Sequence, residues 1–135
     1  MSFADELLAA QMRIENALER TRVLLIQRLY RDIIFDTPVL DGTLRGSWRT
    51  STDRPSEDQS PVTDPAGVGT TRAMEVVVNG STWGVDVCLV NNIPYAYRIE
   101  FLGWSAVKAP QGMVRRNVLR VQDILQSVQR QVNRR

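Results

Sequence analysis

The residue types that most often carry chemistry in proteins are nearly missing from this chain. Its 135 residues include no histidine and a single cysteine, Cys88. Histidine is the commonest general base near neutral pH and the commonest metal ligand. Zinc sites and Ser-His or Cys-His nucleophiles need partners that this composition does not supply. The sequence therefore predicts a protein that is not an enzyme and that holds no metal.

The other chemical patterns are incomplete. The acidic residues are scattered, and none stands in a hydrolase or EF-hand pattern. Residues 66–69 read Ala-Gly-Val-Gly and lack the Lys-Ser or Lys-Thr that completes a phosphate-binding loop. Cys88 lies in an apolar run, which favours a plain buried thiol over a reactive one. We therefore expect no cofactor.

Arginine is the residue type that points to binding. Lys108 is the only lysine, and arginine suits paired hydrogen bonds with carboxylate or phosphate. From residue 105 to the end, seven basic residues stand against one acid, Asp123, so this stretch has a net charge of +6 and the rest of the chain −4. This polarity predicts an acidic partner or DNA at the C-terminal end, and a solvated helix face explains it equally well.

The elements that position these arginines begin with a long helix at residues 3–34. The segment contains no Gly or Pro, and its apolar residues recur at helical spacing: Leu7, Ile14, Leu18, Leu25, Leu29 and Ile33. Such a helix is roughly 45 Å long, whereas a compact chain of this size has a radius of gyration of about 14 Å. It either overhangs the globule and offers apolar length to a neighbour, or bends onto its own sheet.

The middle of the chain predicts a small sheet. Asp36-Thr37-Pro38 ends the first helix, because the residue before a proline is pushed out of the helical conformation. We expect a strand at residues 44–52 and a long mobile loop at residues 53–70, which are polar and rich in Pro and Gly. Residues 74–78 and 85–89 alternate in the manner of strands around an Asn79-Gly80 turn, which predicts a β-hairpin.

The last third predicts two helices. Pro94 suits the first turn of a short helix that ends at Gly103. The final segment carries an apolar seam at steps of four and three: Val114, Val118, Val121, Leu125, Val128 and Val132. The expected fold class is α+β: a long N-terminal helix, a small antiparallel sheet with a long loop, a short helix and a C-terminal helix packed on the sheet. One domain spans residues 1–135.

Three stretches together resemble one protein family. Residues 37–48 read Thr-Pro-Val-Leu-Asp-Gly-Thr-Leu-Arg-Gly-Ser-Trp, residues 91–103 read Asn-Asn-Ile-Pro-Tyr-Ala-Tyr-Arg-Ile-Glu-Phe-Leu-Gly, and residues 108–115 read Lys-Ala-Pro-Gln-Gly-Met-Val-Arg. They are similar to the Asp-Thr-Gly-x-Leu-Arg-x-Ser, Asn-x-x-Pro-Tyr-Ala and Ala-Pro-x-Gly-Met segments of tail-completion (neck) proteins of the HK97 gp10-like group of long-tailed bacteriophages. In this chain Asp-Gly-Thr replaces Asp-Thr-Gly, and order and spacing agree.

The resemblance implies a structural virion protein at the top of a phage tail. It would form a ring by self-association, with sixfold symmetry, and join the tail tube or tail terminator to the head connector. It would be assembled in the host cytoplasm, with transient contact to passing genomic DNA. Related folds also serve as terminators and stoppers. The candidate partner-binding residues are Arg45, Trp48, Tyr95, Trp104, Arg115, Arg116 and Arg120, with Glu100 as a candidate partner of Arg45; for the aromatic residues, core packing competes with ring contacts.

The alternative is a nucleic-acid-binding module that uses the arginine-rich C-terminal helix. It requires phosphate contacts and a steep loss of affinity with salt. The net charge of only +2 and the lack of a DNA-reading motif weigh against it. No stretch approaches the ~18 to 20 apolar residues that cross a bilayer, and the N-terminus is acidic where a signal peptide is basic, so no membrane partner is expected.

Overall fold

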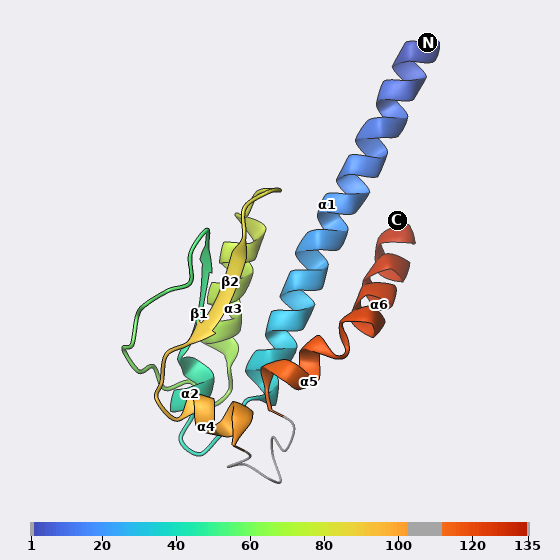
Figure 1. Ribbon diagram of the computed structural model, residues 1–135. Coiled ribbons are helices and arrows are strands. Elements are labelled where there is room, and N and C mark those ends of the chain that lie inside the picture. The colour runs from blue at the N-terminus through green and yellow to red at the C-terminus, as the bar shows by residue number, and fades with distance from the viewer. Residues whose placement is uncertain (1, 103–111, 135) are drawn as a thin grey trace.

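A single long helix organises the protein (Figure 1). The computed structural model describes residues 2–102 and 112–134. Helix α1 (Phe3–Asp36) begins at a capping box, in which the Ser2 hydroxyl accepts from the backbone N–H of Asp5 and the Asp5 carboxylate accepts from that of Ser2. It ends before Thr37-Pro38, as the sequence predicts. The C-terminal part of α1 packs against the remaining elements, and its first turns extend beyond them.

The sheet has two strands. Strand β1 (Trp48–Thr52) pairs antiparallel with β2 (Val87–Asn91), with Trp48 opposite Asn91 and Thr52 opposite Val87. Between them along the chain lies helix α3 (Val68–Asn79), which packs against both α1 and β1. The sheet and α3 therefore form one compact unit on one side of α1.

The predicted hairpin is wrong, because residues 74–78 belong to α3. Met74 and Val78, four residues apart, are fully buried, whereas Val76 is 72% exposed. A strand would have placed all three side chains on one face. Asp64 caps the helix by accepting from the backbone N–H groups of Gly67 and Thr70, and this cap together with core packing overrides the β preference of the three successive valines.

The first predicted strand also begins later than expected. Residues Thr43–Gly46 form the short helix α2, so the strand starts at Trp48 instead of residue 44. Helix α4 (Ala96–Phe101) follows Pro94 closely, as predicted. The predicted end of this short helix at Gly103 lies outside the described residues.

Residues 53–67 join β1 to α3 without helix or strand, and α3 begins at Val68 inside the expected loop. Arg49 donates to the carbonyl of Ser60 at 2.7 Å, and the Asn92 amide donates to the carbonyls of Ser56 and Asp58 at 2.9 Å each. These bonds tie the connection to the edge of the sheet.

The C-terminal segment is two helices, α5 (Val114–Val118) and α6 (Val121–Asn133). The apolar face of α6 packs on α1 and not on the sheet: buried Ile124, Val128 and Val132 contact Ala17, Leu24, Leu25 and Leu29. The break at residues 119–120 shifts the seam, so Val118 is 49% exposed and Ile124, off the predicted seam, is buried. The expected position of this helix is therefore corrected.

The main core lies on the other side of α1 and joins α1, α2, α3, α4, the sheet and the start of α5: Ile33, Ile34, Leu44, Trp48, Met74, Val78, Ile93, Ala96 and Met113. The fold class is α+β, as predicted. Among the described residues, no helix combines the length and apolar character needed to cross a bilayer.

Truncating Met74 or Val78 tests the helical register of α3. We expect Met74→Ala to lower the free energy of unfolding by about 2–5 kcal/mol, because it leaves a cavity in the core. The matched control Val76→Ala should change it by less than about 0.5 kcal/mol, because its side chain faces solvent. Equilibrium urea unfolding measures both. A loss for Val76→Ala as large as that for Met74→Ala would instead support the strand.

Candidate partner-binding cleft

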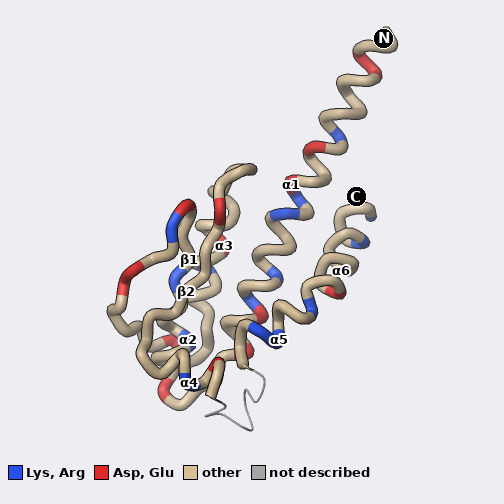
Figure 2. Tube along the Cα trace, in the orientation of Figure 1, with Lys and Arg blue, Asp and Glu red and all other residues tan. Residues whose placement is uncertain are grey.

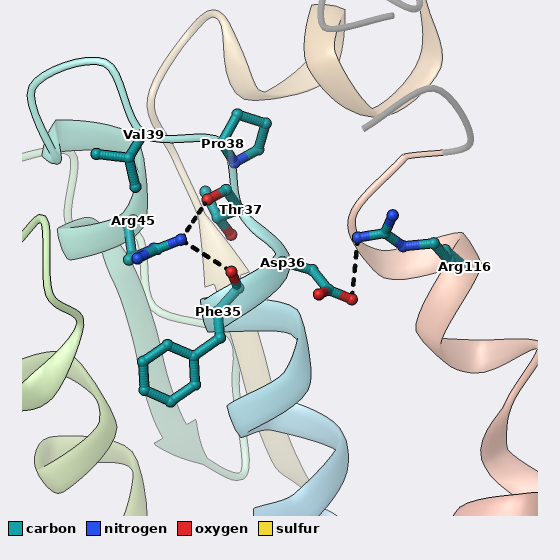
Figure 3. Close-up of a pocket in the computed structure, with 7 residues that line it drawn as sticks. All are labelled: Phe35, Asp36, Thr37, Pro38, Val39, Arg45 and Arg116. Carbon is teal, nitrogen blue, oxygen red and sulfur yellow. Dashed lines mark hydrogen bonds and ion pairs between the residues drawn. The ribbon is translucent and has the colours of Figure 1, made fainter. Parts of the chain in front are cut away.

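A cleft opens where α1 ends, between the segment that follows it, α2 and α5 (Figure 3). Its volume is about 360 Å³. The lining residues are Phe35, Asp36, Thr37, Pro38, Val39, Arg45 and Arg116. Two of the predicted partner-binding arginines, Arg45 and Arg116, thus face one cleft from different elements.

Arg45 binds the end of α1. Its guanidinium donates to the backbone carbonyls of Phe35 at 2.8 Å, Thr37 at 3.0 Å and Pro65 at 2.8 Å. The last carbonyls of a helix have no partner within the helix, and they favour positive charge. Since α1 has no basic residue in its own last turn, Arg45 supplies that charge from α2.

Asp36 gathers the C-terminal arginines. Its carboxylate accepts from Arg116 at 3.0 Å and from the side-chain amide of Asn117 at 2.8 Å, and Arg120 lies 3.9 Å away. Figure 2 shows basic positions at α5 close to acidic positions at the C-terminal end of α1. Asp36 therefore fastens α5 to α1.

The cleft keeps an excess of positive charge. Among the described residues that line it, Asp36 is the only acidic one, against Arg45 and Arg116, and the hydrogen bonds of Arg45 go to neutral carbonyls. Within the described residues, the Nε atoms of both arginines are buried without a hydrogen-bond partner. Guanidinium groups arranged in this way suit a carboxylate or phosphate oxygen.

Arg115, and not Arg45, is the partner of Glu100. The buried Glu100 carboxylate accepts from the backbone N–H groups of Met113, Val114 and Arg115 at the start of α5, and from the Arg115 guanidinium at 3.2 Å. Gly112 approaches so closely that a Cβ there would lie 2.6 Å from a Glu100 oxygen. The predicted Arg45–Glu100 pair is therefore wrong, because Glu100 holds the N-terminus of α5.

Burial raises the pKa of Glu100, but the hydrogen bonds from Arg115, Val114 and Met113 together outweigh it. The pKa of the carboxyl consequently lies below its ordinary value of 4.5. The ionised form is the one that holds α5.

The predicted aromatic residues are divided. Trp48 is buried and donates from its ring nitrogen to the hydroxyl of Thr37 at 2.8 Å, so it is a core residue. Tyr95 is half-buried and packs against the main core, and burial and the nearby Asp41 raise its pKa. Trp104 lies outside the described residues.

Sequence reasoning missed Asp36, Asn117 and the role of Glu100 as a helix clamp. Asp36 is recognisable only as the last residue before Thr-Pro, and nothing in the pattern names its partners.

Comparisons with models of protein families, with curated proteins and with solved structures found no match for this chain.

Replacing Glu100 tests the clamp by its pH dependence. Because the folded pKa lies below the unfolded one, the stabilisation is complete above the unfolded value and is lost as the pH falls through the folded value. We expect Glu100→Gln to cost about 1–3 kcal/mol at pH 7 and to flatten the acid limb below about pH 5.

Thermal unfolding between pH 3 and pH 7 measures this effect. The exposed Glu57→Gln serves as the matched control and should keep the wild-type acid limb. Equal pH profiles for Glu100→Gln and wild type would show that the carboxylate does not hold α5.

Proposed function

We propose that the chain is a structural virion protein at the top of a phage tail, and not an enzyme. It forms a ring by self-association, with a hexamer as the expected state, and joins the tail tube or tail terminator to the head connector. The protein is assembled in the host cytoplasm and lies in the neck of the finished virion.

One observation carries the proposal: the family-like stretches contact one another near the end of α1, although residues 49–90 separate the first stretch from the second. Asn91 of the second stretch donates to the carbonyl of Leu44 in the first at 2.8 Å. Glu100 of the second binds the backbone of Met113 in the third. Segments with such mutual contacts are constrained together, which gives their joint appearance a physical reason and supports the resemblance.

The contacts also explain the residue types in those stretches. Gly112 has a φ of +84° and no room for a Cβ beside Glu100, so the Gly-Met pair and the glutamate require one another. Gly42 has a φ of +93°, and a Cβ there would lie 2.4 Å from the backbone nitrogen of Pro65. These residues set shape, as a binding subunit requires.

What remains at the surface is suited to docking. No group of described residues is arranged to hold a metal ion. The cleft between Arg45 and Arg116 would accept an acidic side chain of a neighbouring subunit or connector protein, since a guanidinium pairs well with a carboxylate. Passing DNA would make at most transient contacts.

The nucleic-acid alternative has fewer arginines to use than the sequence suggests. Arg115 is paired with Glu100, and Arg116 and Arg120 lie beside Asp36. Arg130 and Arg134 remain exposed on α6. Phosphate binding would therefore depend on the far end of that helix.

A phage that lacks this gene product tests the proposal. We expect its lysate to contain DNA-filled heads and separate tails, because the junction cannot close. Electron microscopy of the null-mutant lysate, with a complemented lysate as control, decides this. Normal attached particles in the null lysate would rule out the neck role.

Reversing single arginines compares the basic charge of Arg120, beside Asp36, with that of Arg130 further along α6. Arg120→Glu should fail to complement the null phage while keeping the circular dichroism spectrum, because the Arg120 side chain is 55% exposed and a rim charge acts mainly on association. Arg130→Glu on α6 is the matched control and should complement.

The nucleic-acid alternative gives a different pattern. Both variants would then fail, and the purified wild-type protein would bind DNA with an affinity that falls steeply with salt. Fluorescence anisotropy with a labelled duplex measures this.

A further inference from the structure

The N-terminal arm of α1, residues 3–16, extends away from the globule (Figure 1), and its large apolar side chains are exposed. At 1.5 Å per residue the arm is about 20 Å long. Its large apolar residues are more than half exposed: Phe3, Leu7, Leu8, Met12 and Ile14. Such a length of exposed apolar helix indicates a contact with another molecule.

Part of the arm continues the stripe that α6 covers. Phe3, Leu7, Ala10 and Ile14 precede Ala17 at steps of four, three, four and three. Ala17, seven residues before Leu24, is where the packing of α6 on this face of α1 ends. The arm therefore presents the same stripe, spaced as a coiled-coil seam, and no helix of the described part of the chain packs over it.

The charges beside the seam are reciprocal. Glu6 directly precedes Leu7, and Arg13 directly precedes Ile14, so the two occupy the same flanking position one heptad apart. In an antiparallel helix pair, equivalent flanking positions face each other across the seam. Glu6 of each helix then meets Arg13 of the other, which gives two ion pairs.

We propose that the arms of two copies of this chain pack antiparallel along this seam. Leu7 lies opposite Ala10 and Phe3 opposite Ile14, each twice. A parallel pair would place Glu6 beside Gln11 and Arg13 beside Leu18, which gives no ion pair. The charge pattern thus selects the antiparallel arrangement and a second copy as the occupant.

This contact is isologous, because each copy contributes the same surface. It lies outside the symmetry of a cyclic ring, so it joins either two free subunits or two rings, whose own contacts belong to the globule. The inference goes beyond the proposed neck function and stands without it. Because the seam is only two heptads long, the association is weak and depends on concentration.

Sedimentation velocity across a range of protein concentrations tests the pairing. At high concentration the wild type should form a particle with twice the mass of the Leu7→Asp particle. Leu7→Asp should weaken the association by at least about tenfold, because its charge would be buried in the seam without a partner. Leu8→Asp is the matched control: Leu7 is 59% and Leu8 56% exposed, but Leu8 lies off the seam. Both variants should keep the wild-type melting temperature.

A charge exchange tests the orientation. Glu6→Arg and Arg13→Glu should each weaken the particle, the double exchange should restore it, and Glu15→Arg, off the seam, should have no effect. Three results would each overturn the antiparallel pair. The first is a wild type that forms no particle whose mass Leu7→Asp halves. The others are equal effects of Leu7→Asp and Leu8→Asp, and a double exchange that does not restore association.

Discussion

The end of α1 is the constraint on which the rest of the fold depends. A helix of this length brings its last carbonyls into the middle of the protein, where they need donors. Thr37 donates its hydroxyl to Ile33 and accepts from the Trp48 ring, while Arg45 binds the carbonyls of Phe35 and Thr37. Satisfying this helix end fixes α2 and the start of β1 at once.

The same helix end explains why the arginines near it are not free surface charges. Asp36 holds Arg116 and Asn117, and thereby α5, against α1. Part of the positive charge of the C-terminal stretch is therefore paired with carboxylates of the same chain. The cleft itself brings together two guanidinium groups and one carboxylate.

Local rules found the elements whose signals are local. The helix ending at Thr37-Pro38 and the helix after Pro94 were predicted because proline restricts the backbone directly. Residues 74–78 were predicted wrongly as a strand, because the alternation of Met74, Val76 and Val78 fits both periods over so short a run. The Asp64 cap and the burial of Met74 and Val78 favour the helix over the strand, and both depend on tertiary structure.

The site was predicted only in part for a similar reason. Residue type identified Arg45 and Arg116 as binding groups, but pairing depends on distance in space. Glu100 was expected beside Arg45 and lies instead at the start of α5, where three backbone N–H groups stabilise it. No sequence pattern named Asp36, whose partners come from 80 residues further along the chain, as the 81-residue separation to Asn117 shows.

The placement of α6 gives the protein two levels of stability. Its three buried residues form a small cluster on α1, separate from the main core, and Leu29 contacts both clusters. Because this cluster is separate from the main core, we expect α6 to open in local fluctuations at a lower free energy than global unfolding requires. Each such opening exposes Leu24 and Leu25, so the apolar stripe of the arm lengthens toward the globule while the main core stays folded. Access to the root of α1 is thus governed by the local opening equilibrium of α6.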